Sequence, residues 1–195
     1  MLSANETTTV LLCGVGGQGT ILAADLLARA AMASGVQVKV SEIHGMSQRG
    51  GAVTTVVRFG SNVKSMVADK GCCDCVVSFE KMEALRNLPF LKKGGVLLVN
   101  DEVIKPQSVA TGKSSMPPRM SQTLAEENAM LIPAASLAAQ AGTAKAANVV
   151  LLGALSVSLD FSQEVWEECI KQRVPAKFVE ANLAAFAAGR AFAQK

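Results

Sequence analysis

The stretch TTVLLCGVGGQGTILAADLLARAAMASG, residues 8–35, decides the fold class of this chain. It begins with Thr8–Cys13, a short apolar run with β-branched side chains, which is typical of a buried parallel strand. Glycines end the run, and Thr20–Ala33 then follows the period of a helix, with Gly35 suited to the position just past its end. The pattern therefore predicts a strand, a tight glycine turn and a helix in succession.

The same alternation continues along the chain. Further strands are expected at Val36–Ser41, Ala52–Phe59, Cys75–Phe79, Gly95–Asn100 and Ala129–Ile132. Helices are expected at Glu80–Asn87, Ala134–Ala141, Ala146–Leu155, Gln163–Arg173 and from Ala176 onward. This order predicts an α/β, Rossmann-like fold: a mostly parallel sheet flanked by helices, with right-handed crossovers and a helical C-terminal section.

Length and composition indicate one domain. The chain has 195 residues, and domains typically hold roughly 100–200, so we expect residues 1–195 to form a single unit. Half of the residues are hydrophobic but only 4% are aromatic, which favours a core of Ala, Val and Leu. Between 106 and 121 the sequence changes to Ser, Pro, Lys and Gly, which predicts an exposed loop.

Charge and cysteine content argue against several classes of protein. The net charge of +3 includes no run of five like charges, so neither a nucleic acid nor an anionic membrane is indicated as a partner. Neither a signal peptide nor an apolar segment of about 18 residues is recognisable, and we expect a cytoplasmic protein. Five cysteines, one of them within the first predicted strand, favour reduced thiols over a disulfide framework.

The glycine turn, GVGGQG at residues 14–19, fits the G-x-G-x-x-G pattern and has the strand before it and the helix after it that the pattern requires. Such a turn lets a phosphate approach the backbone N–H groups at the helix N-terminus. A dinucleotide site would also need an acidic residue at the end of the second strand to bind the ribose. Glu42 is roughly in place, but it leads directly into the loop at 44–51, and nothing else in the sequence indicates a nicotinamide site. The alternative is a glycine turn that serves only close packing of strand and helix.

A second candidate loop, residues 44–51, follows the second predicted strand and holds the only histidine. His44 could act as an acid or base, but Ser47 is merely close in sequence and no triad is evident; local hydrogen bonding or an interface is the alternative. Arg49-Gly50-Gly51 combines a planar cation with accessible backbone, which suits phosphate or carboxylate. The alternative there is a β-turn with an exposed arginine.

The sequence CCDC at residues 72–75 raises the question of a metal site. Iron–sulfur clusters and structural zinc normally need four ligands, and only Cys72 and Cys75 have suitable spacing. Cys75 also begins a predicted buried strand. We therefore expect no metal ligands in this chain.

Three motifs in order resemble one known family. GVGGQG at 14–19, HGMSQRGGAV at 44–53 and NVVLLGAL at 148–155 are similar to the gamma subunit or domain of 2-oxoacid:ferredoxin oxidoreductases, and in particular to the indolepyruvate ferredoxin oxidoreductase beta-subunit branch. The resemblance extends from about Thr8 to Phe192. Many members have an aromatic-glycine pair where this chain has His44-Gly45, a form that resembles the aryl-pyruvate branch.

The resemblance implies a part in the CoA-dependent oxidative decarboxylation of a 2-oxoacid to acyl-CoA and carbon dioxide, with ferredoxin taking the electrons. It implies that thiamine diphosphate and the iron–sulfur clusters lie on partner subunits, that this chain contacts coenzyme A or the thiamine subunit, and that it has no catalytic residue of its own. The candidate binding residues carried over by motif are Gly14, Gly16, Gly17, Gln18 and Gly19 in the first loop, and Ser47, Gln48, Arg49, Gly50 and Gly51 in the second.

Two other functions remain open at this stage. One is a free-standing NAD(P)-dependent dehydrogenase that uses the glycine turn and Glu42. The other is a pure docking module, in which all three motifs serve an interface and no small ligand binds. In each case we expect the two loops to lie at the carboxyl ends of adjacent strands, where open α/β sheets place their ligands.

Overall fold

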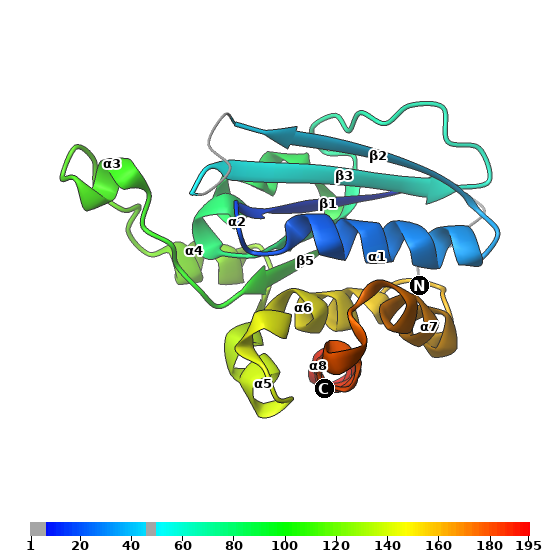
Figure 1. Cartoon of the computed structure of the whole chain (residues 1–195). Coiled ribbons are helices and arrows are strands. Elements are labelled where there is room, and N and C mark those ends of the chain that lie inside the picture. Colours follow the sequence, from blue (N-terminus) through cyan, green and yellow to red (C-terminus); the bar gives the residue numbers. More distant parts are fainter. Residues whose placement is uncertain (1–6, 46–49) are drawn as a thin grey trace.

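The computed structural model describes residues 7–45 and 50–195. Its centre is a six-stranded sheet with the strand order β2-β3-β1-β4-β5-β6 (Figure 1). Within it, β3 is antiparallel to both of its neighbours and the remaining pairs are parallel. The predicted α/β fold with a mostly parallel sheet is confirmed. The strands are β1 (Thr8–Val15), β2 (Gln37–His44), β3 (Ala52–Gly60), β4 (Cys73–Ser78), β5 (Leu91–Asn100) and β6 (Met130–Ile132).

The position of β3 corrects one expectation from the sequence. The two candidate loops do not follow adjacent strands, because β3 lies between β1 and β2. The physical reason is the short connection from β2 to β3, residues 45–51, since a parallel crossover takes about a dozen residues or more. Both β1 and β2 run antiparallel to β3, so their carboxyl ends still share one edge of the sheet.

Burial along the strands follows the sequence pattern. All of β4 and nearly all of β1 are buried, as expected for apolar strands in the middle of a sheet covered on both faces. In contrast, β2 is an edge strand and is largely exposed. The exposed edge therefore lies on the side of the sheet that carries Glu42 and His44.

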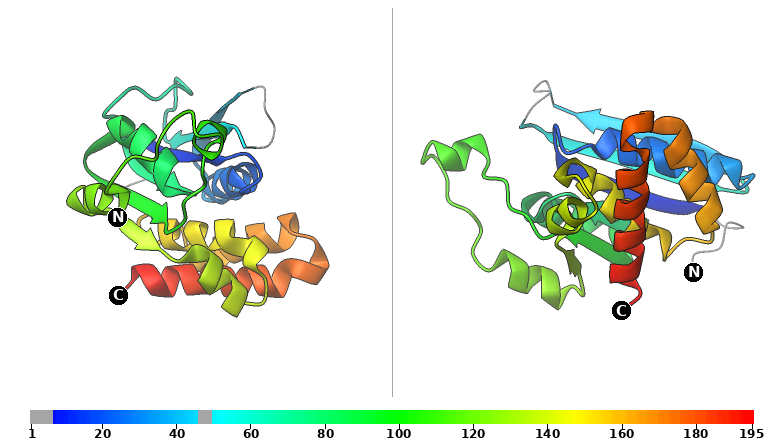
Figure 2. Two further views of the ribbon diagram at one scale, coloured as in Figure 1. Left: turned by 90° about the vertical axis from the view of Figure 1, so that its left-hand side faces the viewer. Right: turned by 60° about the horizontal axis from the view of Figure 1, so that its bottom comes forward.

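One face of the sheet is covered by the first helix and by the whole C-terminal section (Figure 2). α1 and α7 have the bounds that the sequence pattern predicts, because each has an apolar stripe of helical period. Short 3-10 turns at Ala144–Ala146 and Ala176–Phe178 precede two of the helices. The helices on this face are α1 (Thr20–Ala33), α5 (Ala134–Gln140), α6 (Ala147–Ser156), α7 (Gln163–Arg173) and α8 (Val179–Ala193).

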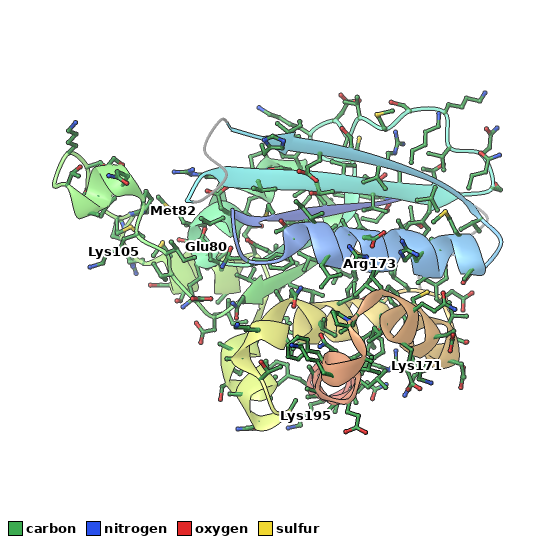
Figure 3. All side chains as sticks on the ribbon, in the orientation of Figure 1. Glu80, Met82, Lys105, Lys171, Arg173 and Lys195 are labelled. Carbon is green, nitrogen blue, oxygen red and sulfur yellow. The ribbon has the colours of Figure 1, made fainter. Side chains whose placement is uncertain are left out.

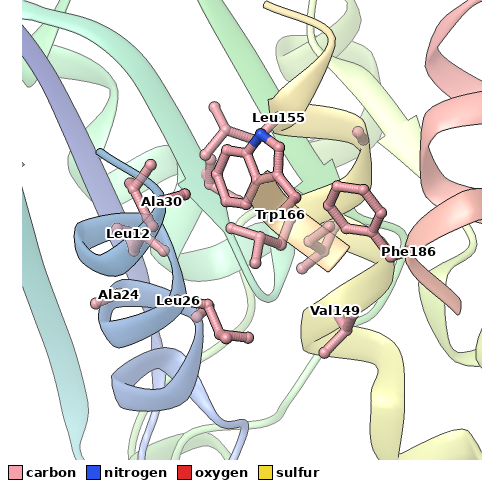
Figure 4. Packing of buried hydrophobic residues seen from close by; sticks show 14 of the residues in the cluster. Leu12, Ala24, Leu26, Ala30, Val149, Leu155, Trp166 and Phe186 are labelled. Carbon is pink, nitrogen blue, oxygen red and sulfur yellow. The ribbon is translucent and has the colours of Figure 1, made fainter. Parts of the chain in front are cut away.

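Trp166 on α7 lies at the centre of this layer and is fully buried. Its ring packs 5.8 Å from that of Phe186 on α8 and 5.9 Å from that of Phe161, measured between ring centroids. Figure 4 shows the indole between residues of β1 and α1 on one side and residues of α6 and α8 on the other. Phe161 in turn packs 5.2 Å from Phe59 on β3, so this row of rings joins the C-terminal helices to the sheet.

α6 and α8 cross with their backbones in contact. A Cβ placed on Gly153 would lie 2.1 Å from the carbonyl oxygen of Phe186, and one on Gly189 would lie 1.9 Å from that of Val150. Both distances are far inside the van der Waals limit, so only glycine fits at either position. The third motif of the sequence, at 148–155, thus contains a helix-packing glycine.

The opposite face carries a thinner layer, formed by α2 (Lys81–Asn87), a 3-10 turn at Leu88–Phe90 and α4 (Met120–Glu126). Between β5 and α4 the chain leaves the body of the protein and returns, and we call residues 103–119 the arm (Figure 1). The sequence pattern predicts only a loop at 106–121, but α3 (Gln107–Ala110) and the start of α4 lie within it. A turn of helix this short is held by local hydrogen bonds and leaves no apolar period in the sequence.

Candidate functional site

The glycine turn lies at the carboxyl edge of the sheet, between β1 and α1. Gly17 and Gly19 have φ values of +105° and +82°, a region that side chains disfavour. Gly14 has no room for a side chain, because a Cβ there would lie 2.8 Å from Cβ of Phe79. The glycines are therefore required for the conformation of the turn, whether or not it binds a ligand.

Gln18 uses its side chain inside the turn. Its Oε1 accepts a hydrogen bond from the N–H of Val15 at 2.7 Å, and its Nε2 donates to the carbonyl oxygen of Phe79 at 2.9 Å. The amide thereby ties the turn to the end of β4. Gln18 positions the turn, and both ends of its amide are already engaged within the protein.

Asn148, at the start of α6, supports the turn from the other side. This side chain is buried, and its Nδ2 donates a hydrogen bond of 3.2 Å to the carbonyl oxygen of Gly19. The sequence contains a signal for it, a lone Asn opening the apolar run NVVLLGAL, but nothing in the sequence says what it contacts. The first and third motifs are thus in direct contact across 129 residues of sequence.

The N-terminus of α1 opens into a cavity of about 440 Å³, which we call the turn cavity. The cap residue Gly19 makes no side-chain hydrogen bond, and the first turn of α1 has no acidic residue. The first N–H groups of the helix and its positive dipole end are therefore available to an anion. The cavity is lined by Gly16, Gly17, Gly19, Thr20, Ile21, Glu42, His44 and Val53.

Glu42 and His44 occupy the side of the turn cavity that β2 forms. The Glu42 Oε1 and His44 Nε2 atoms are 4.0 Å apart, and Nδ1 of His44 lies 3.1 Å from the carbonyl oxygen of Gly45. The imidazole is exposed over 58% of its side chain. The cavity is therefore bipolar, with helix N–H groups at one end and a carboxylate beside an imidazole at the other.

Of the second candidate loop, Ser47, Gln48 and Arg49 lie outside the described residues. Gly50 has a φ of +76°, and the carbonyl oxygen of Gly51 accepts a hydrogen bond of 2.8 Å from the N–H of Gly16. The end of the second loop therefore lies directly against the glycine turn. Although β3 separates the two strands, the described parts of the two loops meet at one place.

A second cavity, of about 370 Å³, lies between the end of β1, α2 and the root of the arm. Its wall includes Gly50, Lys105 and the buried Glu80, whose carboxylate accepts hydrogen bonds from the N–H groups of Met82 and Glu83 and so caps α2 (Figure 3). Burial raises the pKa of Glu83, an effect that Arg86, bonded to it at 2.9 Å, opposes. These carboxylates are engaged in local structure.

The cysteines divide by exposure. Cys72 is exposed, whereas Cys13, Cys73, Cys75 and Cys169 are buried. Burial raises the pKa of Cys13, Cys73 and Cys75 to about 12, so these thiols are protonated at neutral pH. Within residues 7–45 and 50–195, no group of three or more His, Cys, Asp or Glu side chains is arranged to hold a metal ion.

The same described ranges include no helix that is long and apolar enough to cross a bilayer.

Comparison with known proteins identifies the family. The sequence pattern described as "Pyruvate ferredoxin/flavodoxin oxidoreductase" matches residues 9–192. The indolepyruvate oxidoreductase subunit IorB of Thermococcus kodakarensis is 41% identical over 187 residues, which cover 92% of this chain and 93% of that protein. The IorB subunit of Pyrococcus horikoshii is also 41% identical, with the same coverage.

A solved structure agrees with these relatives. The gamma subunit of a keto/oxoacid ferredoxin oxidoreductase from Geobacter sulfurreducens PCA is 29% identical and superposes with a TM-score of 0.70, covering 96% of this chain and 98% of that one. The resemblance predicted from three motifs is therefore confirmed over almost the whole length. The chain belongs to the pyruvate ferredoxin/flavodoxin oxidoreductase family.

Proposed function

We propose that this chain is the small subunit of a 2-oxoacid:ferredoxin oxidoreductase that oxidises an aryl-pyruvate such as indolepyruvate. The observation that carries the proposal is the identity of 41% over nearly the full length to subunits named for indolepyruvate. The reaction would convert the 2-oxoacid and coenzyme A to an acyl-CoA and carbon dioxide, with ferredoxin as electron acceptor. Other subunits of the complex are the partners.

The chemistry of the described residues supports an auxiliary role. The three thiols with a pKa of about 12 are poor nucleophiles at neutral pH, because nucleophilic attack needs the thiolate. Among the described residues, no group of three or more His, Cys, Asp or Glu side chains is arranged to hold a metal ion. Glu80 and Glu83 are engaged at the N-terminus and in the first turn of α2. We therefore assign thiamine diphosphate and the iron–sulfur clusters to the partner subunits, and assign bond-making chemistry to them as well.

The turn cavity is the proposed contact with coenzyme A. Its volume of about 440 Å³ lies within the roughly 300–1,000 Å³ of small-molecule sites, and it suits one phosphate-bearing portion of the molecule. The uncapped N-terminus of α1 would hold phosphate oxygens, and Glu42 and His44 would face hydroxyl or amide groups at the other end. Arg49 and its neighbours Ser47 and Gln48 are proposed to complete the anion contact.

Reconstitution tests the assignment. The chain should be inactive alone, and together with the larger subunit from the neighbouring reading frame it should support ferredoxin reduction that requires both indolepyruvate and coenzyme A. Activity of the chain alone with a nicotinamide cofactor would instead establish the dehydrogenase alternative. Normal assembly but lost acyl-CoA formation after substitutions in the glycine turn would argue against the pure docking module, in which that turn serves only an interface.

Arg49→Ala in the reconstituted complex examines the anion contact, with Lys171→Ala, at an exposed cation on α7, as the control. We expect the KM for coenzyme A to rise several-fold in Arg49→Ala at unchanged KM for indolepyruvate, because a lost phosphate contact affects only the ligand that carries phosphate. An unchanged KM for coenzyme A in both variants would remove Arg49 from the proposed site.

A further inference from the structure

The arm, residues 103–119, carries the whole net charge of the protein. Three of the 19 Lys and Arg residues of the chain lie in it, and none of the 16 Asp and Glu residues does. The remainder of the chain therefore has sixteen charges of each sign and is neutral overall. Because these residues project from the body, the entire excess of charge lies on one part of the surface (Figure 1). The three cations, all of them exposed, are Lys105, Lys113 and Arg119.

The arm buries none of its own residues. Every residue from 103 to 119 is described, and none of them is buried. Its tip is nevertheless folded: α3 is followed by Gly112 with a φ of +74°, and the N–H groups of Lys113 and Ser114 both donate to the carbonyl oxygen of Ser108. Ordering a segment costs conformational entropy that burial of apolar surface normally offsets. An arm that buries none of its residues is therefore suited to contact with a surface outside the chain.

Both ends of the arm are fastened to the start of α2. The Lys81 ammonium is paired with the carboxylate of Asp101 and donates a hydrogen bond of 3.0 Å to the hydroxyl of Ser121. Glu80 accepts a hydrogen bond from the N–H of Ile104. The arm thus leaves the body away from the sheet and from the C-terminal helices, as Figure 1 and the right view of Figure 2 show.

The root of the arm lies beside the candidate site. Lys105 and Gln107 line the same cavity as Val15, which ends β1, and Gly50, which belongs to the second loop. A protein bound along the arm would therefore also face the carboxyl edge of the sheet, where the turn cavity opens. The root of the arm and the turn cavity therefore lie at the same edge of the sheet.

We propose that the arm docks onto an acidic surface of the larger oxidoreductase subunit and holds that subunit over the turn cavity. This inference rests on the proposed function for the identity of the partner, and on the charge and exposure of the arm for its chemistry. Opposite charge steers association and sets the salt dependence of binding. The arm is the part of this protein that would supply both.

The test is the affinity of the chain for the larger subunit, measured at low and at moderate ionic strength. The arm variant is Lys105→Glu/Lys113→Glu/Arg119→Glu. The control is Lys70→Glu/Lys171→Glu/Lys195→Glu, which makes the same change of charge at exposed positions elsewhere; Figure 3 shows Lys171 and Lys195 among the C-terminal helices. Thermal unfolding of both variants verifies that each is folded.

We expect the arm variant to bind at least about tenfold more weakly, with a flatter dependence on salt, and the control to change less than about threefold. A glutamine version of the arm variant should lie in between. Equal weakening by the arm variant and the control would overturn the arm as the docking element while leaving the proposed function intact. Failure of the unaltered chain to bind the larger subunit would overturn both.

Discussion

Glycine is required in two regions of the protein, for different physical reasons. In the turn after β1, Gly17 and Gly19 are needed because their backbone is left-handed, and the space beside Gly17 is open. At the crossing of α6 and α8, Gly153 and Gly189 are helical and are needed because two backbones touch. In the turn, one side of the glycines packs against the protein and the other side faces open space. At the crossing, both sides are packed. The open region is suited to a ligand, and the closed one to stability.

The largest expected effect is at the crossing. In an ordinary helix Gly→Ala stabilises by about 1 kcal/mol. Gly189→Ala should reverse that sign and lower the free energy of unfolding by about 3 kcal/mol, because the new Cβ would lie 1.9 Å from the carbonyl oxygen of Val150. The midpoint of thermal unfolding should fall by roughly 6–12 °C. Ala187→Leu, on the exposed side of the same helix, should stay within about 0.5 kcal/mol.

Gly19→Ala comes next and can be dissected by a matched control. Gly19 and Gly35 have nearly equal φ values, +82° and +81°, but a Cβ on Gly19 would lie 2.6 Å from Nδ2 of Asn148, whereas one on Gly35 would meet nothing within 4 Å. We expect Gly35→Ala to cost about 1 kcal/mol for the backbone alone and Gly19→Ala about 2 kcal/mol or more. Equal losses of unfolding free energy for the two variants, measured by chemical denaturation, would show that the Asn148 side chain moves aside at no cost.

Asn148→Ala tests the same contact between Asn148 and Gly19. Loss of the hydrogen bond to Gly19 and of buried volume should lower the free energy of unfolding by about 1–2 kcal/mol. In this background Gly19→Ala should cost no more than Gly35→Ala, since the side chain it meets is gone. A double-mutant cycle measures this coupling. Additive costs would mean that the first and third motifs are not energetically linked.

The glycine turn is the part of the site that the sequence pattern defines best. The spacing of the glycines between a buried strand and an amphipathic helix can be read from neighbouring residues alone. For this reason the sequence pattern predicts α1 with its observed bounds. The pairing of β3 between β1 and β2 is non-local, and only the shortness of the 45–51 connection bears on it. In the same way, Asn148 and Gly153 stand in an apolar helix whose sequence does not reveal what lies across from it.

A smaller effect on stability than at Gly19 is expected for Gly17→Ala. The position has a φ of +105° and open space around it, so the cost should be about 1 kcal/mol of backbone strain with no clash. Its effect on the KM for coenzyme A in the complex should exceed that of Gly35→Ala, because Gly35 is equally open but lies just past the opposite end of α1. If the two substitutions change the KM alike, the open side of the turn is not the ligand side.

The most direct test of the account places a charge at the mouth of the turn cavity. Ile21, in the first turn of α1, is 59% exposed and lines the cavity. Ile21→Glu puts a carboxylate where helices tolerate one best, so the fold should not suffer, and it should repel a phosphate from the helix N-terminus. In the reconstituted complex the account predicts a KM for coenzyme A at least about tenfold higher in Ile21→Glu, against a change within about twofold in Ile21→Gln. Equal KM values for the two variants would contradict it.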